Sequence, residues 1–165
     1  MLLAVMALLL IPVSVQAAAA KPGTVKLSSI KDVDYNKINI KWKKPSGKFT
    51  NYCIYYREKN SNGKWIRIKT VNNKTLSYTH TSSAKYPIVT GETYQYTVRA
   101  YNKKSKQYGN YNKSGLTTKT RPQQVKLTGI SYDEDEGVTI TWNKAGGAYL
   151  YRIYCKSKYK ESCEI

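Results

Sequence analysis

The side chains that could carry acid–base, nucleophilic or metal chemistry are few in this chain of 165 residues. The single histidine, His80, lies in a run of serine and threonine, with no cysteine or carboxylate motif beside it. Residues 22–121 contain only four acidic side chains, and these form no recognisable acid–base pair, metal-ligand set, nucleophile motif or phosphate loop. We therefore expect a protein that is not an enzyme, with no catalytic residue, no metal site and no cofactor.

Lysines form the first candidate binding surface. The formal net charge is +18, and most of it belongs to residues 22–121, which hold 21 Lys and Arg against 4 Asp and Glu. Residues 122–165 hold six of each and are neutral. A strip of cations attracts polyanions at low ionic strength. By strand alternation, four lysines are expected on one outer face, which we call the lysine face: Lys26, Lys37, Lys41 and Lys43.

Two interpretations of the lysine face stay open. In the first, it binds a polyanion such as an anionic cell-wall polymer, an acidic polysaccharide, phospholipid headgroups or extracellular DNA. In the second, the lysines keep the protein soluble and prevent strand edges from pairing. We favour the second, because lysine is poorly suited to bidentate recognition and residues 22–121 contain only four arginines. Among the polyanions, nucleic acid is not an expected partner.

Aromatic residues form the second candidate surface. The chain has sixteen tyrosines, and alternation places Tyr55 and Tyr101 on the outward side of two expected strands, where Trp65 could extend them. If these two strands lie side by side in one sheet, their aromatic side chains form a flat platform that could stack on sugar rings. The alternative is cross-strand pairing that only stabilises the sheet, by about 0.2–1 kcal/mol per pair. We favour the alternative, because aromatic residues are common on strands.

Both surfaces require β-strands to position them. Ile38, Ile40 and Trp42 alternate with polar residues, and a two-residue period places the apolar side chains on one face of a strand. Turn clusters separate such runs, and no segment after residue 20 shows a sustained helical period. The pattern predicts a sandwich of seven strands, near residues 24–31, 36–43, 50–57, 64–71, 76–80, 92–102 and 115–120.

A segment of the first unit returns one hundred residues later. Pro22–Ile30 matches Pro122–Ile130, with Pro, Val, Lys, Leu and Ile at the same spacing, and the strand that ends in Trp42 returns as one that ends in Trp142. Such agreement marks a duplicated unit. The inward positions of both copies predict a structural core made of Trp42, Tyr52, Ile54, Tyr94, Tyr96, Val98 and Trp142.

Three segments of different character divide the chain. Residues 1–20 are an apolar run that ends in small residues, as in a secretory signal peptide. The alternative is a membrane anchor, but Pro12 and Ser14 interrupt the run before the roughly 18–20 residues that span a bilayer. Residues 21–121 hold one complete domain, and residues 122–165 hold only the first three strands of a second. We therefore expect a fragment of a longer multi-domain protein.

The motifs of the first unit resemble those of the fibronectin type III family. The resemblance rests on Pro22, on Trp42 in the second strand, on the Tyr52-x-Ile54-x-Tyr56 third strand and on the Gly91-x-x-Tyr94-x-Tyr96-x-Val98-x-Ala100-x-Asn102 run. It implies an immunoglobulin-like β-sandwich of seven strands in two sheets, in which Tyr94 resembles the tyrosine-corner residue whose hydroxyl bonds to upstream backbone. Function stays open, because this fold hosts many unrelated roles.

Three functional hypotheses follow. The leading one is a secreted or cell-surface module that spaces or presents neighbouring domains and contacts extracellular carbohydrate or a host surface protein in adhesion. The second is a polyanion-binding adhesin that uses the lysine face. The third, which rests on family analogy, is the accessory portion of a larger exported glycan-degrading enzyme. The junction Lys119–Pro122 has almost no linker, which favours spacing, because such a tandem behaves as a semi-rigid rod.

Overall fold

The computed structural model describes residues 20–61 and 63–156. Apart from Ala20, the predicted signal peptide (residues 1–20) lies outside the described residues. The part of the chain that the structure describes contains no helix capable of crossing a membrane. Its elements are the strands β1 (Lys26–Asp34), β2 (Lys37–Lys43), β3 (Asn51–Glu58), β4 (Ile66–Asn72), β5 (Ser77–Thr81), β6 (Thr93–Asn102), β7 (Gln107–Tyr108), β8 (Leu116–Lys119), β9 (Lys126–Asp133) and β10 (Gly137–Asn143).

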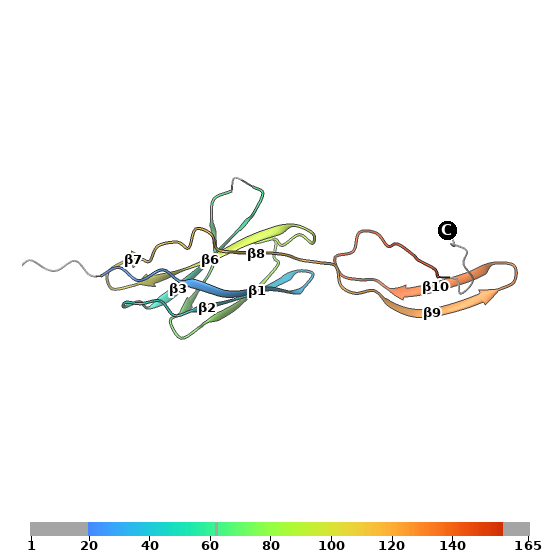
Figure 1. The fold of residues 1–165 in the computed structure, drawn as a ribbon, viewed down its shortest axis with the longest axis horizontal. Coiled ribbons are helices and arrows are strands. Elements are labelled where there is room, and N and C mark those ends of the chain that lie inside the picture. Colours follow the sequence, from blue (N-terminus) through green and yellow to red (C-terminus); the bar gives the residue numbers. More distant parts are fainter. Residues whose placement is uncertain (1–19, 62, 157–165) are drawn as a thin grey trace, which may run out of the picture.

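Two antiparallel sheets form the sandwich of the first unit (Figure 1). One sheet has the strand order β1-β2-β5. The other has the order β4-β3-β6-β7, and β8 pairs with the first residues of β6. This arrangement confirms the predicted all-β, immunoglobulin-like sandwich in two sheets. It differs from the prediction in one element, since the short strand β7 adds an eighth strand to the expected seven.

The extra strand β7 forms because the chain turns back directly after β6. Tyr108 pairs with Tyr101, and Gln107 pairs with Asn102. Lys106 has φ 54°, the left-handed conformation that a tight turn requires. A strand of two residues leaves no alternation in the sequence, so the two-residue period could not reveal it.

The core lies between the two sheets. Six of the seven predicted core residues are buried there: Trp42, Tyr52, Ile54, Tyr94, Tyr96 and Val98. Trp42 on β2 meets Tyr52 on β3 edge-to-face, with ring centroids 5.4 Å apart. The Tyr94 hydroxyl accepts a 2.9 Å hydrogen bond from the backbone N–H of Val89, five residues upstream. The geometry of Tyr94 is therefore that of a tyrosine corner.

His80 on β5 is also part of this core. Its Nε2 lies 3.2 Å from the carbonyl oxygen of Tyr86, and its Nδ1 lies 2.7 Å from the hydroxyl of Tyr96. A carbonyl only accepts, so Nε2 carries the proton and the Tyr96 hydroxyl donates to Nδ1. Burial lowers the pKa of His80, because the surroundings disfavour the charged imidazolium. The ring is therefore a neutral packing residue.

The second unit contains one hairpin, β9–β10, which repeats β1–β2. Ile130 pairs with Ile140 as Ile30 pairs with Ile40. The prediction of a third strand here is wrong, because residues 151–156 form no strand. In the first unit β3 lies between β4 and β6, and the described residues of the second unit contain no counterpart of either. Without a neighbouring ladder, a short extended segment does not form a strand.

Trp142 is half-buried, which differs from the prediction that it belongs to a core. Its ring packs on Tyr151, with centroids 5.5 Å apart. The equivalent Trp42 is enclosed because the β3–β6 sheet lies opposite it. No opposing sheet faces Trp142 within the described part of the second unit. Trp142 therefore occupies the predicted core position, but the described residues contain no second sheet that would bury it.

Candidate binding surface

The outer face of the β3–β6 sheet carries two of the residues predicted to form an aromatic platform. Opposite residues of an antiparallel pair point to the same face. The outward pairs are Asn51–Tyr101, Cys53–Arg99, Tyr55–Thr97 and Arg57–Gln95. Aromatic, cationic and polar side chains therefore lie close together on this face.

Tyr55 is only 8% exposed, so the prediction that it faces solvent is wrong. The reason is Tyr111, whose ring meets that of Tyr55 edge-to-face with centroids 5.4 Å apart. Tyr111 belongs to residues 107–113, which we call the covering segment because it lies over the outer face. Burial raises the pKa of the Tyr55 phenol to about 12. A covered phenol cannot serve as an open platform for a sugar.

Arg99 fastens the covering segment to the sheet. Its guanidinium carbon lies 4.7 Å from the ring centroid of Tyr108 and 4.1 Å from that of Tyr111. Its Nε also donates a 2.9 Å hydrogen bond to the carbonyl oxygen of Gly109. A cation–π contact stabilises by about 0.5–1 kcal/mol at an exposed site. Two such contacts and a charged hydrogen bond hold the segment in one position.

The other two predicted platform residues lie at opposite ends of this stack. Tyr101 packs against Tyr108, with ring centroids 4.4 Å apart. Trp65 lies nearly parallel to Tyr111, with centroids 6.3 Å apart and an interplanar angle of 14°. The structure therefore does not bring Tyr101 and Trp65 together with Tyr55 as one exposed surface, because the covering segment separates them.

A groove opens at the Trp65 end of the stack, with a volume of about 780 Å³. We call it the Trp65 groove, and its lining residues are Thr24, Arg57, Trp65, Asn110, Tyr111 and Lys113. The lining contains two cations and no carboxylate. It combines aromatic rings, positive charge and neutral hydrogen-bonding groups, which are the contacts that a polar organic anion requires.

The side of the groove formed by Thr24 depends on a close backbone approach. A Cβ on Gly109 would lie 2.6 Å from the carbonyl oxygen of Gly23, so a larger residue would push the two segments apart. Beside this contact, Lys21 Nζ donates a 2.8 Å hydrogen bond to Asn110 Oδ1. The start of the chain before β1 is thereby held against the covering segment.

One residue of the lysine face, Lys37, differs from the other three because it forms an ion pair. Lys26 and Lys43 lie directly opposite each other across β1 and β2, and Lys41 is exposed on β2. Lys37 instead forms an ion pair with Asp34, with 3.3 Å between Nζ and Oδ2. Lys37 therefore has a carboxylate partner, whereas Lys26, Lys41 and Lys43 form no ion pair with any carboxylate of residues 20–61 and 63–156.

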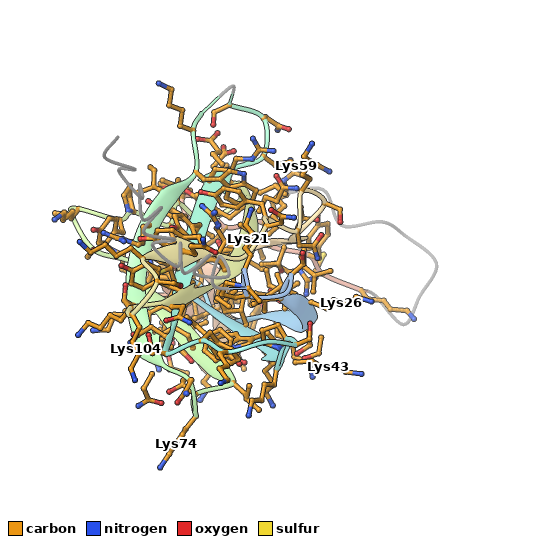
Figure 2. The ribbon with its side chains drawn as sticks, turned by 90° about the vertical axis from the view of Figure 1, so that its left-hand side faces the viewer. Lys21, Lys26, Lys43, Lys59, Lys74 and Lys104 are labelled. Carbon is orange, nitrogen blue, oxygen red and sulfur yellow. The ribbon has the colours of Figure 1, made fainter. Side chains whose placement is uncertain are left out.

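Other lysines of the first unit point in other directions. Figure 2 shows Lys26 and Lys43 extending outward on the same side, whereas Lys59, Lys74 and Lys104 lie on other sides of the sandwich. The positive charge therefore surrounds the first unit, and the lysine face is one part of that distribution.

Four residues of this surface were not predicted from the sequence: Arg57, Arg99, Tyr108 and Tyr111. Both arginines occupy outward positions beside the outward tyrosines of the same two strands, and this placement is a signal for stacking that alternation could have supplied. The two tyrosines lie in or next to the two-residue strand β7, where no period predicts their direction.

Metal ligands are not grouped on the part of the chain that the structure describes, where no three His, Cys, Asp or Glu side chains lie together. Cys53 is buried, with its Sγ 3.7 Å from Thr70 Oγ1. The contacts that the described surface offers are stacking, positive charge and hydrogen bonding.

The fold and this surface define a class of protein, an immunoglobulin-like antiparallel β-sandwich with an aromatic–arginine stack outside one sheet. The family model for the fibronectin type III domain matches residues 20–112. The chain belongs to the fibronectin type III family, whose domains are generally non-catalytic modules.

Similar solved structures include one FNIII domain with a TM-score above 0.5 and others below it. A human fourth FNIII domain superposes with a TM-score of 0.51 at 19% identity, covering 66% of this chain and 87% of that one. The FN5 domain of Drosophila Lar gives 0.43 at 22% identity, covering 62% and 97%. The fn3 domain of the human collagen alpha-1(XX) chain gives 0.44 at 16% identity, covering 66% and 91%. No curated protein sequence matches the chain.

Proposed function

We propose that this chain is a non-catalytic module of an exported or cell-surface protein, and that it sets the spacing between neighbouring domains. The observation that supports the proposal is the junction between the two units. Only Thr120 and Arg121 separate the end of β8 from Pro122, and Thr120 is fully buried. A junction this short, with one member inside the first sandwich, restricts the angle between the units.

Gln123 bridges the two units through its side chain. Its Nε2 donates a 2.9 Å hydrogen bond to Asp34 Oδ1 in the turn between β1 and β2. Its Oε1 accepts a 3.0 Å hydrogen bond from the backbone N–H of Gly146 in the second unit. The backbone N–H of Gln123 also donates to the Gly146 carbonyl oxygen at 2.9 Å. These hydrogen bonds, made by one residue to both units, support a restricted angle between them.

The contact with Gln123 stabilises the ionised form of the Asp34 carboxyl group. The hydrogen bond from Gln123, followed by the one from the backbone N–H of Tyr35, lowers the pKa of the Asp34 carboxyl group. Arg121 adds an exposed ion pair with Asp32 at 3.8 Å, which contributes little by itself because water screens it. The Gln123 bridge is therefore the main directional contact at the junction.

The spacing role is tested by Gln123→Ala in the whole chain. NMR residual dipolar couplings of residues 26–119 and 126–143 would be measured in one alignment medium. In the natural sequence both segments should report a common alignment tensor. In Gln123→Ala the magnitude of the tensor for residues 126–143 should decrease, because without the Gln123 bridge the second unit moves relative to the first. Gln124→Ala, at an exposed neighbouring residue, is the matched control. Separate tensors in the natural sequence would exclude a fixed spacing.

A second candidate function, polyanion binding by the lysine face, is favoured by one specific observation. Lys26 and Lys43 lie directly opposite each other, and a like-charged cross-strand pair destabilises a sheet. A site that accepts this cost has a use for concentrated positive charge. Replacing both by serine should lower the salt concentration at which the chain leaves a heparin column by more than the same change at Lys59 and Lys74. Equal shifts would indicate that only net charge matters.

A further inference from the structure

We propose that the Trp65 groove binds an acidic saccharide, a sugar chain that carries carboxylate or sulfate groups. This role goes beyond domain spacing and does not depend on it. The groove volume of about 780 Å³ falls within the roughly 300–1,000 Å³ of small-molecule sites and leaves room for more than one sugar ring. None of the groove's lining residues belongs to the lysine face, and the nearest of them in sequence, Thr24, lies two residues before Lys26.

The charge of the groove favours an anionic ligand. Arg57 and Lys113 line it, and neither forms an ion pair with any residue that the structure describes. No carboxylate lies among the lining residues. Two cations held in one concave site without a counter-charge raise the local concentration of anions. An anionic group entering the groove would gain both interactions without displacing an internal partner.

Arg57 is oriented before any ligand arrives. Its Nε donates a 2.8 Å hydrogen bond to Gln95 Oε1 on the adjacent strand, and its guanidinium carbon lies 4.6 Å from the centre of the Trp65 ring. These two contacts engage Nε and one face of the guanidinium. The terminal amino groups stay available to bind a carboxylate or sulfate through two parallel hydrogen bonds.

The rest of the groove suits a sugar ring. Trp65 is half-buried and nearly parallel to Tyr111. The part of the Trp65 ring that Arg57 leaves uncovered, together with the Tyr111 ring, offers an apolar surface against which the C–H groups of a pyranose can pack. Asn110 gives its carbonyl oxygen to Lys21, which leaves the amide N–H groups to donate to a hydroxyl. Thr24 supplies a further hydroxyl that can donate or accept.

The groove is rigid on the side of the covering segment. Tyr111 is held by the guanidinium of Arg99 at 4.1 Å and by the ring of Tyr55 at 5.4 Å. Gly109 is held by Arg99 on one side and lies close to Gly23 on the other. A preformed site loses less conformational entropy on binding, which favours affinity for a flexible, weakly hydrophobic ligand such as a sugar chain.

Isothermal titration calorimetry of the whole chain with three probes tests this site: a heparin hexasaccharide, a hyaluronan hexasaccharide and maltohexaose. We expect at least one of the two acidic probes to bind and neutral maltohexaose not to bind. Trp65→Ala and Arg57→Gln should each weaken that binding by about tenfold or more, because each removes either the stacking surface or the paired hydrogen bonds. Lys26→Ser with Lys43→Ser is the control and should change affinity by less than about threefold.

NMR supplies a readout that a purely structural role of Trp65 would not move. The indole N–H resonance of Trp65 should shift on titration, while that of the buried Trp42 should stay in place. Lys113→Gln, at an exposed residue, should leave folding intact and reduce affinity in the same direction as Arg57→Gln. The proposal is overturned if neither acidic probe binds, if maltohexaose binds as well, or if only the lysine-face control loses binding.

Discussion

The hairpins β1–β2 and β9–β10 share a sequence pattern and a register but differ in what covers them. In both, the tryptophan of the second strand lies opposite a leucine, Leu27 with Trp42 and Leu127 with Trp142. Trp42 is 2% exposed, whereas Trp142 is half-buried and Leu127 is 71% exposed. The equivalent positions therefore make the same local structure in two different environments.

This difference separates local from non-local causes of structure. The hairpin itself needs only alternating side chains and a turn, and Gly137 at φ 82° supplies the left-handed residue that ends the turn of β9–β10. Burial needs a second sheet. Ile38 is 0% exposed because the β3–β6 sheet faces it, while its counterpart Val138 is 61% exposed. Within the described residues, most of the free energy of burying apolar surface is therefore gained in the first unit.

The largest expected effect comes from replacing each of the two tryptophans in turn. Trp42→Ala should lower the free energy of unfolding by about 3–5 kcal/mol, because it leaves a cavity between the sheets. Trp142→Ala should lower it by less than about 1 kcal/mol, since this ring is only partly buried and has no second sheet over it among the described residues. Urea denaturation followed by circular dichroism measures both. Should Trp42→Ala fail to fold, Trp42→Phe and Trp142→Phe provide the same comparison at smaller size. Equal losses of unfolding free energy at the two positions would contradict the conclusion that a second sheet buries Trp42 but not Trp142.

The second prediction uses the buried histidine, which only the first unit has. The pKa of His80 is lowered in the folded state, so the folded protein binds fewer protons than the unfolded chain once the pH falls below the ordinary value of 6.5. Stability is therefore fully present above pH 6.5 and decreases as the pH falls from there toward the lowered pKa, by up to about 1.4 kcal/mol per pH unit.

Urea midpoints of the first unit measured between pH 7.5 and 5 test this decrease. His80→Gln is the matched control, because an amide can keep the hydrogen bonds to Tyr86 and Tyr96 without titrating. The slope between pH 6.5 and 5 should be smaller in His80→Gln than in the natural sequence. A slope that persists unchanged would show that other groups cause it.

The smallest expected effect concerns the covering segment, which covers the outer face of the β3–β6 sheet. In the hairpin β9–β10, by contrast, one face is left open among the described residues. Tyr111→Leu removes one cation–π contact with Arg99 and the ring contacts with Tyr55 and Trp65, and should cost about 1–2 kcal/mol. Tyr132→Leu, at a residue 73% exposed on β9, is the control and should change stability by less than about 0.5 kcal/mol. Differential scanning calorimetry on both variants checks the order, and a larger loss in Tyr132→Leu would contradict it.

Most of the fold followed from the sequence because its cause is local. Alternation and turn residues predicted every strand of the first unit except β7, which is too short to show a period. The predicted strand at 151–154 is absent because a strand depends on neighbours that a local pattern does not contain.

The candidate binding surface was harder to predict for a related reason. Alternation gives the face on which Tyr55 lies, but not whether another segment covers that face. Tyr111, which covers it, lies in a loop that packs through its contacts with Arg99 and Trp65. The carboxylate that neutralises Lys37 was present in the sequence at Asp34, three residues away, and only the turn geometry pairs them.

Amide hydrogen exchange of Ile40 and Ile140 tests most directly whether burial under a second sheet, and not the sequence pattern of the strands, decides the local stability of the two hairpins. Ile40 pairs with Ile30 on one side and Tyr78 on the other, whereas among the residues that the structure describes Ile140 pairs with Ile130 only. The Ile40 amide should exchange with a free energy close to that of global unfolding, and the Ile140 amide with only a small fraction of it. Equal protection of the two amides would contradict this account.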